Sequence, residues 1–275
     1  MKYTVQSTKY VLKNWLYLLP FAILPAVFLA FSTDEGAIER VLKAFFNGRI
    51  ADISFPDLFR AISILSFASW QSIVFGVIGI VFIVPCAALL MAILDKHFRI
   101  GKRTWNGIWA KLNDNFLSTF WYVVLLLAIY EIWALLLAAL LFFLSLLPVK
   151  VVAYILMGIC YIGLQVLLLY SVGLIYLWLP CMQITGFRAF EALHYSYQLA
   201  TSIKWRILGG QLVGLLFVQG ALAVCAWFVP TRIAFLALAT VLYAGLILLY
   251  CVRMQIAYFD RDHIDRADLA GYYRK

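Results

Sequence analysis

A single acidic residue, Glu131, lies deep inside a long apolar stretch, where its carboxyl group could carry a charge or a proton. A carboxylate is costly in hydrocarbon, so we expect this side chain to face other helices and find a polar partner, or to be protonated. The expected polar core contains Glu131, Gln165 and Gln219, with Gln211, Tyr130 and Tyr170 as further candidates. Three interpretations remain open: a proton- or cation-linked transport site, a clamp on a lipid headgroup, and a structural hydrogen bond between helices.

Basic side chains beside apolar stretches point to a second kind of chemistry, the binding of anions. Arg253 stands three residues after Tyr250, at the end of the last apolar stretch, where it could snorkel towards headgroups or bind a phosphate. Further candidates for contacts with lipid headgroups lie in the polar loops: Lys102, Arg103, Arg188, Lys204 and Arg206. The net charge of +9 therefore favours anionic phospholipid as the partner and gives no reason to expect nucleic acid.

The chain contains no recognisable catalytic or metal-binding motif. It lacks the G-x-S-x-G, H-E-x-x-H, Walker A and Rossmann patterns. Its 5 cysteines form no C-x-x-C pair, so we expect small, buried, apolar side chains rather than a zinc site or a redox dithiol. The sequence therefore predicts a protein that is not an enzyme and that uses no metal or cofactor.

The charged segment after the last apolar stretch is expected to be a solvated tail. Its acidic and basic residues alternate at helical spacing, which predicts an ion pair between Asp262 and Arg266. The lone histidines His97 and His194 lie in two polar loops and are predicted to be surface residues.

Composition places the chain in a membrane. Of its 275 residues, 65% are hydrophobic and 13% are charged, against about 25% charged in soluble domains. A helix needs about 20 apolar residues to cross the hydrocarbon core, and the qualifying stretches are 15–31, 73–94, 120–147, 151–179, 207–228 and 233–252. We predict an all-α integral membrane protein with a six-helix transmembrane bundle, one domain over residues 1–275. The first stretch is too rich in Trp, Tyr and Pro for a cleaved signal peptide, so we expect it to be retained.

The distribution of Lys and Arg predicts the orientation. With both termini inside, sixteen of the 22 basic residues fall on the cytoplasmic side and six on the other. The predicted cytoplasmic segments are the loops at about 95–116 and 182–206 and the tail 253–275; the outer loop covers about 32–71. We expect a multi-pass protein of the bacterial cytoplasmic membrane with both ends in the cytoplasm.

The outer loop is predicted to contain one or two amphipathic helices. Apolar residues from Ile38 to Phe46 follow helical spacing, and Asn47-Gly48 is a helix stop. A second start lies at Ser54, with Asp57 three residues later. We expect these helices either to rest on the outer membrane surface or to pack over the outer ends of the spans.

A pattern on the inner face predicts an internal repeat. Three short amphipathic segments, 3–14, 102–115 and 188–204, each end next to an aromatic residue that opens a span. Pro85 and Pro180 stand in similar positions, where a span could break at the membrane surface. The predicted architecture therefore has three pseudo-repeats, each an interfacial helix followed by a helical hairpin.

The segment 187–209 carries a family resemblance. It begins Phe-Arg-Ala-Phe-Glu-Ala-Leu, continues through Tyr197 and Ala200-Thr201, and ends Lys-Trp-Arg-Ile-Leu-Gly. It resembles the stretch before a late span in a bacterial superfamily that includes the YciC-like proteins and the membrane domain of some glycerophosphodiester phosphodiesterases. The resemblance implies a membrane module with a role in envelope or lipid homeostasis. The phosphodiesterase barrel is absent here, so the resemblance implies no catalysis.

Three functions follow from these features. The first is non-enzymatic lipid handling or envelope homeostasis, based on the interfacial helices and the resemblance. The second is a small secondary transporter or channel that uses Glu131. The third is a membrane subunit of a larger complex, which would bring a protein partner or a second copy of the chain.

Overall fold

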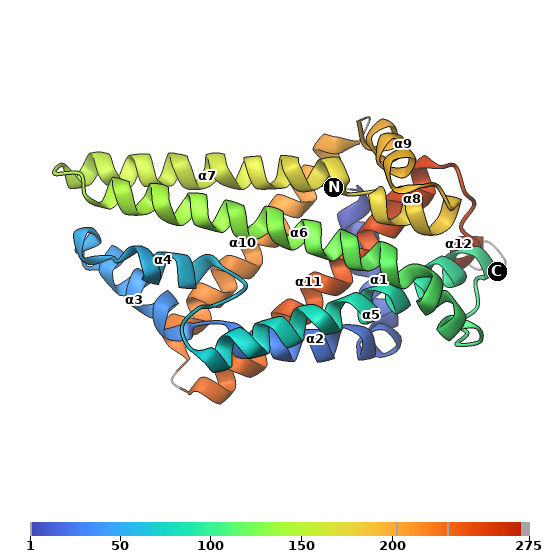
Figure 1. Cartoon of the computed structure of the whole chain (residues 1–275), viewed down its shortest axis with the longest axis horizontal. Coiled ribbons are helices and arrows are strands. Elements are labelled where there is room, and N and C mark those ends of the chain that lie inside the picture. Colours follow the sequence, from blue (N-terminus) through green and yellow to red (C-terminus); the bar gives the residue numbers. More distant parts are fainter. Residues whose placement is uncertain (1, 202, 230, 271–275) are drawn as a thin grey trace.

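The computed structural model describes residues 2–201, 203–229 and 231–270, and every regular element in these ranges is a helix (Figure 1). The elements are α1 (Lys2–Leu18), α2 (Pro20–Ser32), α3 (Glu35–Phe46), the short 3-10 turn η1 (Ile50–Asp52), α4 (Phe55–Ile62), α5 (Trp70–Ile100), α6 (Ile108–Ser145), α7 (Lys150–Ile175), α8 (Trp178–Thr185), α9 (Ala189–Thr201), α10 (Lys204–Phe228), α11 (Arg232–Arg261) and α12 (Ala267–Ala270). Five units in the described chain are long and apolar enough to cross a membrane, namely α5, α6, α7 with α8, α10 and α11. The bent pair α1–α2 makes a sixth if it counts as one span. The all-helical fold is thus compatible with a polytopic membrane protein, as predicted.

The predicted first span, 15–31, is divided between two helices. Asn14 has non-helical backbone angles (φ −121°, ψ 16°), Pro20 opens α2, and the axes of α1 and α2 differ by 90°. Proline suits the first turn of a helix because its missing N–H would have no partner there. Along one face of α1 the buried residues recur every three or four positions: Tyr3, Ser7, Tyr10, Asn14 and Leu18. Only α2, with 13 residues, is left to run along the bundle.

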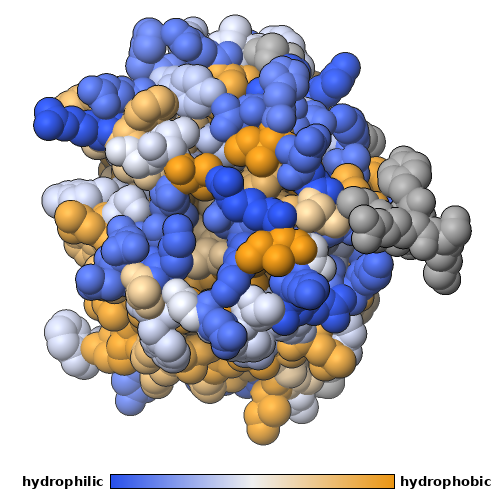
Figure 2. Space-filling model, turned by 90° about the vertical axis from the view of Figure 1, so that its right-hand side faces the viewer, coloured by the Kyte–Doolittle hydropathy of each residue, from blue (hydrophilic) through white to orange (hydrophobic). Residues whose placement is uncertain are grey.

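The first and last parts of the described chain meet at the same end of the bundle. The Lys2 ammonium lies 2.9 Å from Asp260, and the Tyr3 hydroxyl donates to the same carboxylate at 2.6 Å. α8, α9 and α12 lie at this end (Figure 1), which we call the α1/α9 end. The opposite end, with α3, α4 and the turn between α6 and α7, is the α3/α4 end. Figure 2 looks onto the α1/α9 end and shows that hydrophilic side chains gather over much of it.

Several helices extend past their predicted ends. α6 is continuous from Ile108 to Ser145, so the boundary predicted at Phe116 is absent. α5 runs through Pro85 to Ile100, and α11 continues to Arg261 instead of ending at residue 252. A proline inside a membrane helix is tolerated where neighbouring helices and side chains satisfy the freed backbone group. α7 and α8 do separate, at Tyr176 and Leu177. The three-copy repeat is therefore not confirmed.

The two helices predicted in the outer loop are present, as α3 and α4. The Ser54 hydroxyl caps α4 by accepting from the Asp57 backbone N–H at 3.3 Å, and Arg40 of α3 contacts the Asp57 carboxylate at 2.8 Å. The hydrogen bond from Ser54, followed by the contacts with Arg40, lowers the pKa of Asp57. Ile38 of α3 packs with residues of α10 and α11, and Leu58 of α4 with residues of α6 and α7. Both helices thus cover the ends of longer helices, as expected.

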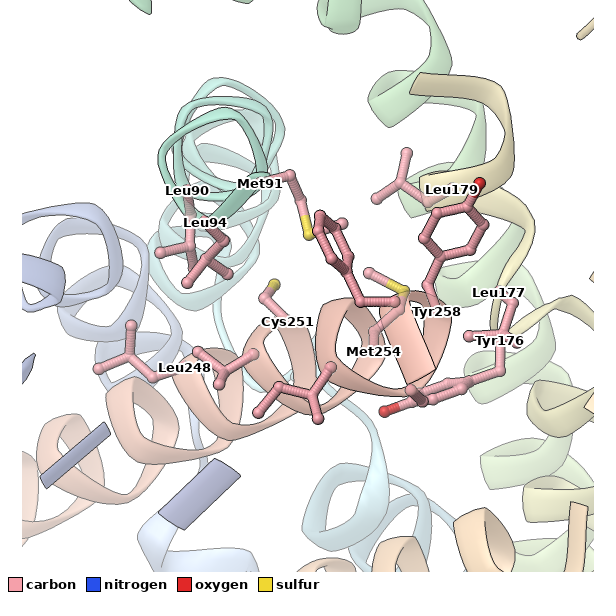
Figure 3. Close-up of a cluster of buried hydrophobic side chains, with 14 of the residues drawn as sticks. Leu90, Met91, Leu94, Tyr176, Leu177, Leu179, Leu248, Cys251, Met254 and Tyr258 are labelled. Carbon is pink, nitrogen blue, oxygen red and sulfur yellow. The ribbon is translucent and has the colours of Figure 1, made fainter. Parts of the chain in front are cut away.

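The main hydrophobic core lies around the last third of α11, towards the α1/α9 end. Every residue of α11 from Cys251 to Phe259 is buried. Side chains of α5, of the α7–α8 junction and of α11 meet there (Figure 3). The α6–α7 hairpin is different, because only 28% of the apolar window of α6 and 22% of that of α7–α8 is buried. Its remaining surface is apolar and suits lipid.

The described part of the tail docks on the bundle, so the prediction of a solvated tail is correct only in part: Asp260, His263 and Asp265 are exposed, whereas Asp262 and Arg266 pack on other helices. The Asp262 carboxylate accepts from the hydroxyls of Tyr195 at 2.5 Å and Tyr258 at 2.8 Å. The hydrogen bond to Asp262 raises the pKa of Tyr195 to about 12. Arg266 pairs with Asp268 at 2.7 Å instead of Asp262, and its guanidinium lies 4.3 Å from the Phe98 ring centroid. Arg266 pairs with a different carboxylate because its side chain docks on α5. Helical spacing within the tail cannot predict this contact with another helix.

The two histidines in the polar loops differ in their surroundings. His97 is buried and forms a hydrogen bond with the Tyr10 hydroxyl of α1, so its predicted surface position is wrong. His194 is exposed and bonds to Gln198 one turn later, as expected for a surface residue. α1 covers the end of α5 and thereby buries His97.

A small-residue contact holds α2 against α5. A Cβ on Gly76 would lie 2.7 Å from the Ser32 hydroxyl oxygen and 2.9 Å from a methyl carbon of Leu65. A Cβ on Gly79 would lie 3.2 Å from side-chain atoms of α2. The absence of side chains at these two positions lets the helices approach closely.

Replacing Gly76 should therefore separate α2 from α5. We expect Gly76→Leu to destabilise the protein by about 1–3 kcal/mol, the usual cost of overpacking, and to lower its thermal midpoint in detergent. Thermal unfolding followed by circular dichroism measures this change. Gly163→Leu is the matched control, because a Cβ on Gly163 of α7 meets nothing within 4 Å. Equal losses in the two variants would contradict the proposed contact.

Candidate functional site

Arg253 is a buried arginine inside α11. Its side chain is 4% exposed, and it precedes the end of the helix at Arg261 by two turns. Sequence reasoning placed it just beyond the last span, but α11 continues past it and neighbouring helices enclose it. Of the two alternatives, snorkelling and phosphate binding, this burial argues against snorkelling, because the guanidinium lies between α11 and α10.

The guanidinium has no carboxylate partner within the described part of the chain. None of the ion pairs in that part involves Arg253. Its Nε and Nη1 atoms are buried and make no hydrogen bond to described residues. A buried charge without a counter-charge is strongly unfavourable, so an anion that reached this position would be bound favourably.

Other unpaired polar groups surround the guanidinium. Both amide atoms of Gln211 and the hydroxyl oxygen of Thr4 are buried without a hydrogen-bond partner. Tyr176 lies close enough to Arg253 and Gln211 to interact with both. Three helices and the α7–α8 junction thus bring a cation, an amide and two hydroxyl groups to one place. We call Thr4, Tyr176, Gln211 and Arg253 the Arg253 cluster.

Two glycines of α10 make room for this cluster. A Cβ on Gly210 would lie 3.0 Å from Nη1 of Arg253 and 2.2 Å from the Thr4 hydroxyl oxygen. A Cβ on Gly214, one turn later, would lie 4.0 Å from Nη2. The spacing Gly-x-x-x-Gly is the sequence signal that could have located the site, because it marks a helix face open to close approach. Sequence reasoning used Gln211 and Arg253 but missed Thr4, Tyr176 and the glycines.

Glu131 serves as a structural acceptor. Ser63 donates its hydroxyl to one carboxylate oxygen at 2.7 Å, and the backbone N–H groups of Ile64 and Leu65 donate to the other at 3.0 and 3.2 Å. The adjacent Tyr130 hydroxyl donates to the Ile62 carbonyl at 2.9 Å. Three donors on two oxygens suit a carboxylate that acts only as an acceptor. These partners favour the structural interpretation and differ from the glutamines considered first.

Gln165 and Gln219 form a separate polar contact. The Gln165 amide donates to the Gln219 side-chain oxygen at 2.8 Å, and the Tyr161 hydroxyl donates to the same oxygen at 2.7 Å. This contact joins α7 to α10. Gln165 and Gln219 thus contact each other, whereas the hydrogen bonds of Glu131, for which both were considered as partners, go to the segment between α4 and α5.

The remaining basic candidates lie on the surface of the α1/α9 end. Lys102 and Arg103 belong to the connection between α5 and α6, and Arg188 directly precedes α9; all three are exposed. Lys204 and Arg206 lie in the first turn of α10. The Lys204 ammonium is 5.5 Å from the Tyr170 ring centroid and 5.8 Å from that of Trp205. Arg253 differs from all five because it is buried.

Comparisons with protein-family models, with curated proteins and with solved structures found no match for this chain.

The contacts of Glu131 predict what its replacement will do. Glu131→Leu removes the acceptor of the Ile64 and Leu65 backbone N–H groups, and each buried donor left unpaired costs about 1–3 kcal/mol. We expect a lower thermal midpoint and faster hydrogen exchange at residues 63–65. Mass-spectrometric hydrogen exchange measures the local effect. Gln219→Leu, at the other polar contact, should leave exchange at 63–65 unchanged; unaltered exchange in Glu131→Leu would contradict the assignment.

Proposed function

We propose that this chain is a non-enzymatic, multi-pass protein of the bacterial cytoplasmic membrane that binds an anionic phospholipid in lipid handling or envelope homeostasis. The single observation that carries the proposal is Arg253, which is 4% exposed and lacks a carboxylate partner in the described chain. The resemblance of segment 187–209 supports the same class of function.

The depth of Arg253 suits the phosphate of a phospholipid. It lies two turns before the end of α11, which corresponds to about 12 Å along the helix axis. The helix end itself bonds to α1 through Asp260, Lys2 and Tyr3. A position one or two turns below a helix end lies near the boundary between headgroups and hydrocarbon.

The chemistry of the cluster suits phosphate as well. An arginine fork donates two parallel hydrogen bonds to phosphate oxygens, and such charge-assisted bonds are about twice as strong as neutral ones. The Gln211 amide and the Thr4 hydroxyl would donate to the same group. The exposed cations of the surrounding surface would raise the local concentration of anionic lipid.

Loss of the Arg253 charge should therefore remove bound lipid. We expect wild-type protein, purified in mild detergent, to retain phosphatidylglycerol in native mass spectrometry, and Arg253→Gln to retain at least about tenfold less. Arg253→Lys should give partial retention, because an ammonium keeps the charge but loses the fork.

Arg49→Gln is the matched control. Arg49 is an exposed arginine just before η1 at the α3/α4 end, so its loss changes the net charge equally without touching the cluster. Circular dichroism of each variant separates loss of lipid from loss of fold. A folded Arg253→Gln protein that retains as much phosphatidylglycerol as Arg49→Gln would refute the proposal.

The proposal places the α1/α9 end in the cytoplasm. This end carries the greater number of Lys and Arg residues, and cytoplasmic segments are enriched in both. We expect a fluorescent protein fused to either terminus to fluoresce in the cytoplasm, and alkaline phosphatase inserted after Asn47, between α3 and η1, to be active outside. A phosphatase that is inactive after Asn47, together with terminal fluorescent proteins that do not fluoresce, would show the opposite orientation.

A further inference from the structure

A second basic site lies in a hollow at the α1/α9 end. It has a volume of about 530 Å³ and lies between the last turns of α5, the connection to α6 and the end of α8. The charged and polar residues in its lining are Asp95, Lys96, Arg99, Asn106, Lys111 and Gln183. The hollow shares no residue with the Arg253 cluster, and its volume falls in the range of about 300–1,000 Å³ that is typical of small-molecule sites.

The charges of the lining are unbalanced and partly fixed in position. Three cationic side chains and one carboxylate give a net charge of +2. Nε of Arg99 donates to Asp95 at 2.8 Å, and the Lys96 ammonium donates to the Asn106 carbonyl across the hollow. Lys111, in the first turn of α6, makes no ion pair within the described chain. The net positive charge of the lining thus favours an anion, and Lys111 at its edge has no ion-pair partner within the described chain.

The hollow also has an apolar wall. Ala92, Ile108 and Ile184 line it beside the charged residues. Ile108 is buried, whereas Ile100 and the neighbouring Trp109 are exposed by 54% and 76%. Exposed Trp and Ile beside cations are typical of a surface at the level of lipid headgroups. A ligand with both an anionic and an apolar part would therefore contact both kinds of lining.

We propose that this hollow binds a phosphate monoester with an apolar substituent. A monoester carries about −1.5 to −2 charges at neutral pH, which matches the lining, whereas a phosphodiester carries one. The ester would place its phosphate between Lys96, Arg99 and Lys111 and its apolar part against Ile108 and Ile184. A lipid monoester and a soluble one share this chemistry. The site stands independently of phospholipid binding at Arg253.

Binding by the intact chain tests this assignment. In nonionic detergent at low ionic strength, calorimetric titration with phenyl phosphate should show binding at least about tenfold tighter than with inorganic phosphate, because only the ester contacts the apolar wall. A second experiment tests lipids. It compares the retention of phosphatidic acid with that of phosphatidylglycerol in phosphatidylcholine nanodiscs. Stronger retention of phosphatidic acid identifies a lipid source, and binding of phenyl phosphate alone identifies a soluble one.

Variants at the rim separate this site from a general effect of charge. Lys111→Gln and Arg99→Gln should each weaken monoester binding by about tenfold, and Lys111→Arg should preserve it. Lys9→Gln removes another exposed lysine, on α1 and outside the hollow, and should have no effect. Arg253→Gln should leave monoester binding intact, which keeps the two sites distinguishable. The assignment is overturned if neither monoester binds, or if Lys9→Gln and Lys111→Gln weaken binding equally.

Discussion

Hydrocarbon cannot hydrogen-bond to polar groups, and this constraint governs the structure. The turn from α4 to α5 shows how the chain meets it. Residues 63–65 leave helical geometry after α4 ends at Ile62, so the backbone groups of this turn need partners. Glu131 accepts from two of these N–H groups, Tyr130 donates to the Ile62 carbonyl, and Ser32 of α2 donates to the Ile64 carbonyl at 3.0 Å. The same segment supplies Leu65, which packs over Gly76. α2, α5 and α6 are therefore joined at one polar turn.

Glu131 and Arg253 illustrate two outcomes of this constraint. Both are ionisable residues within long helices, and both were candidates for function. The carboxylate of Glu131 has three donors, so it is satisfied by the fold itself. Arg253 leaves two nitrogen atoms unpaired, beside an amide and a hydroxyl that are also unpaired. The fold itself thus supplies hydrogen-bond partners to Glu131, whereas the unpaired nitrogen atoms of Arg253 would gain from an anionic partner.

The two ends of the bundle differ in the way they are held together. At the α3/α4 end, short helices pack on a hairpin that otherwise presents an apolar surface. At the α1/α9 end, tyrosines connect elements that are distant in sequence: Tyr3 bonds to Asp260, and Tyr195 and Tyr258 bond to Asp262. Both proposed anion sites lie towards this second end. These tyrosine hydrogen bonds would hold the helices, and with them the cations of both sites, in place. Fixed positions lower the entropic cost of binding a ligand.

Local properties of the sequence determined much of the fold. Long apolar stretches indicated the long helices, because each must satisfy its own backbone in lipid. The Ser54 cap and the Asn47-Gly48 stop predicted α3 and α4 because a helix end depends on a few adjacent residues. The charge bias assigned the segments of Lys2 and Asp260 to one side of the predicted membrane, and these two residues do meet.

Only the tertiary structure decided how the polar residues are used. Which donors reach Glu131 depends on where residues 63–65 turn, and the burial of His97 depends on how α1 crosses α5. The docking of Arg266 on Phe98 and the enclosure of Arg253 by Gly210 and Gly214 join segments far apart in the chain. Periodicity and hydropathy describe one segment at a time. They therefore predict that a helix exists, whereas the partner of each buried charge depends on packing between helices.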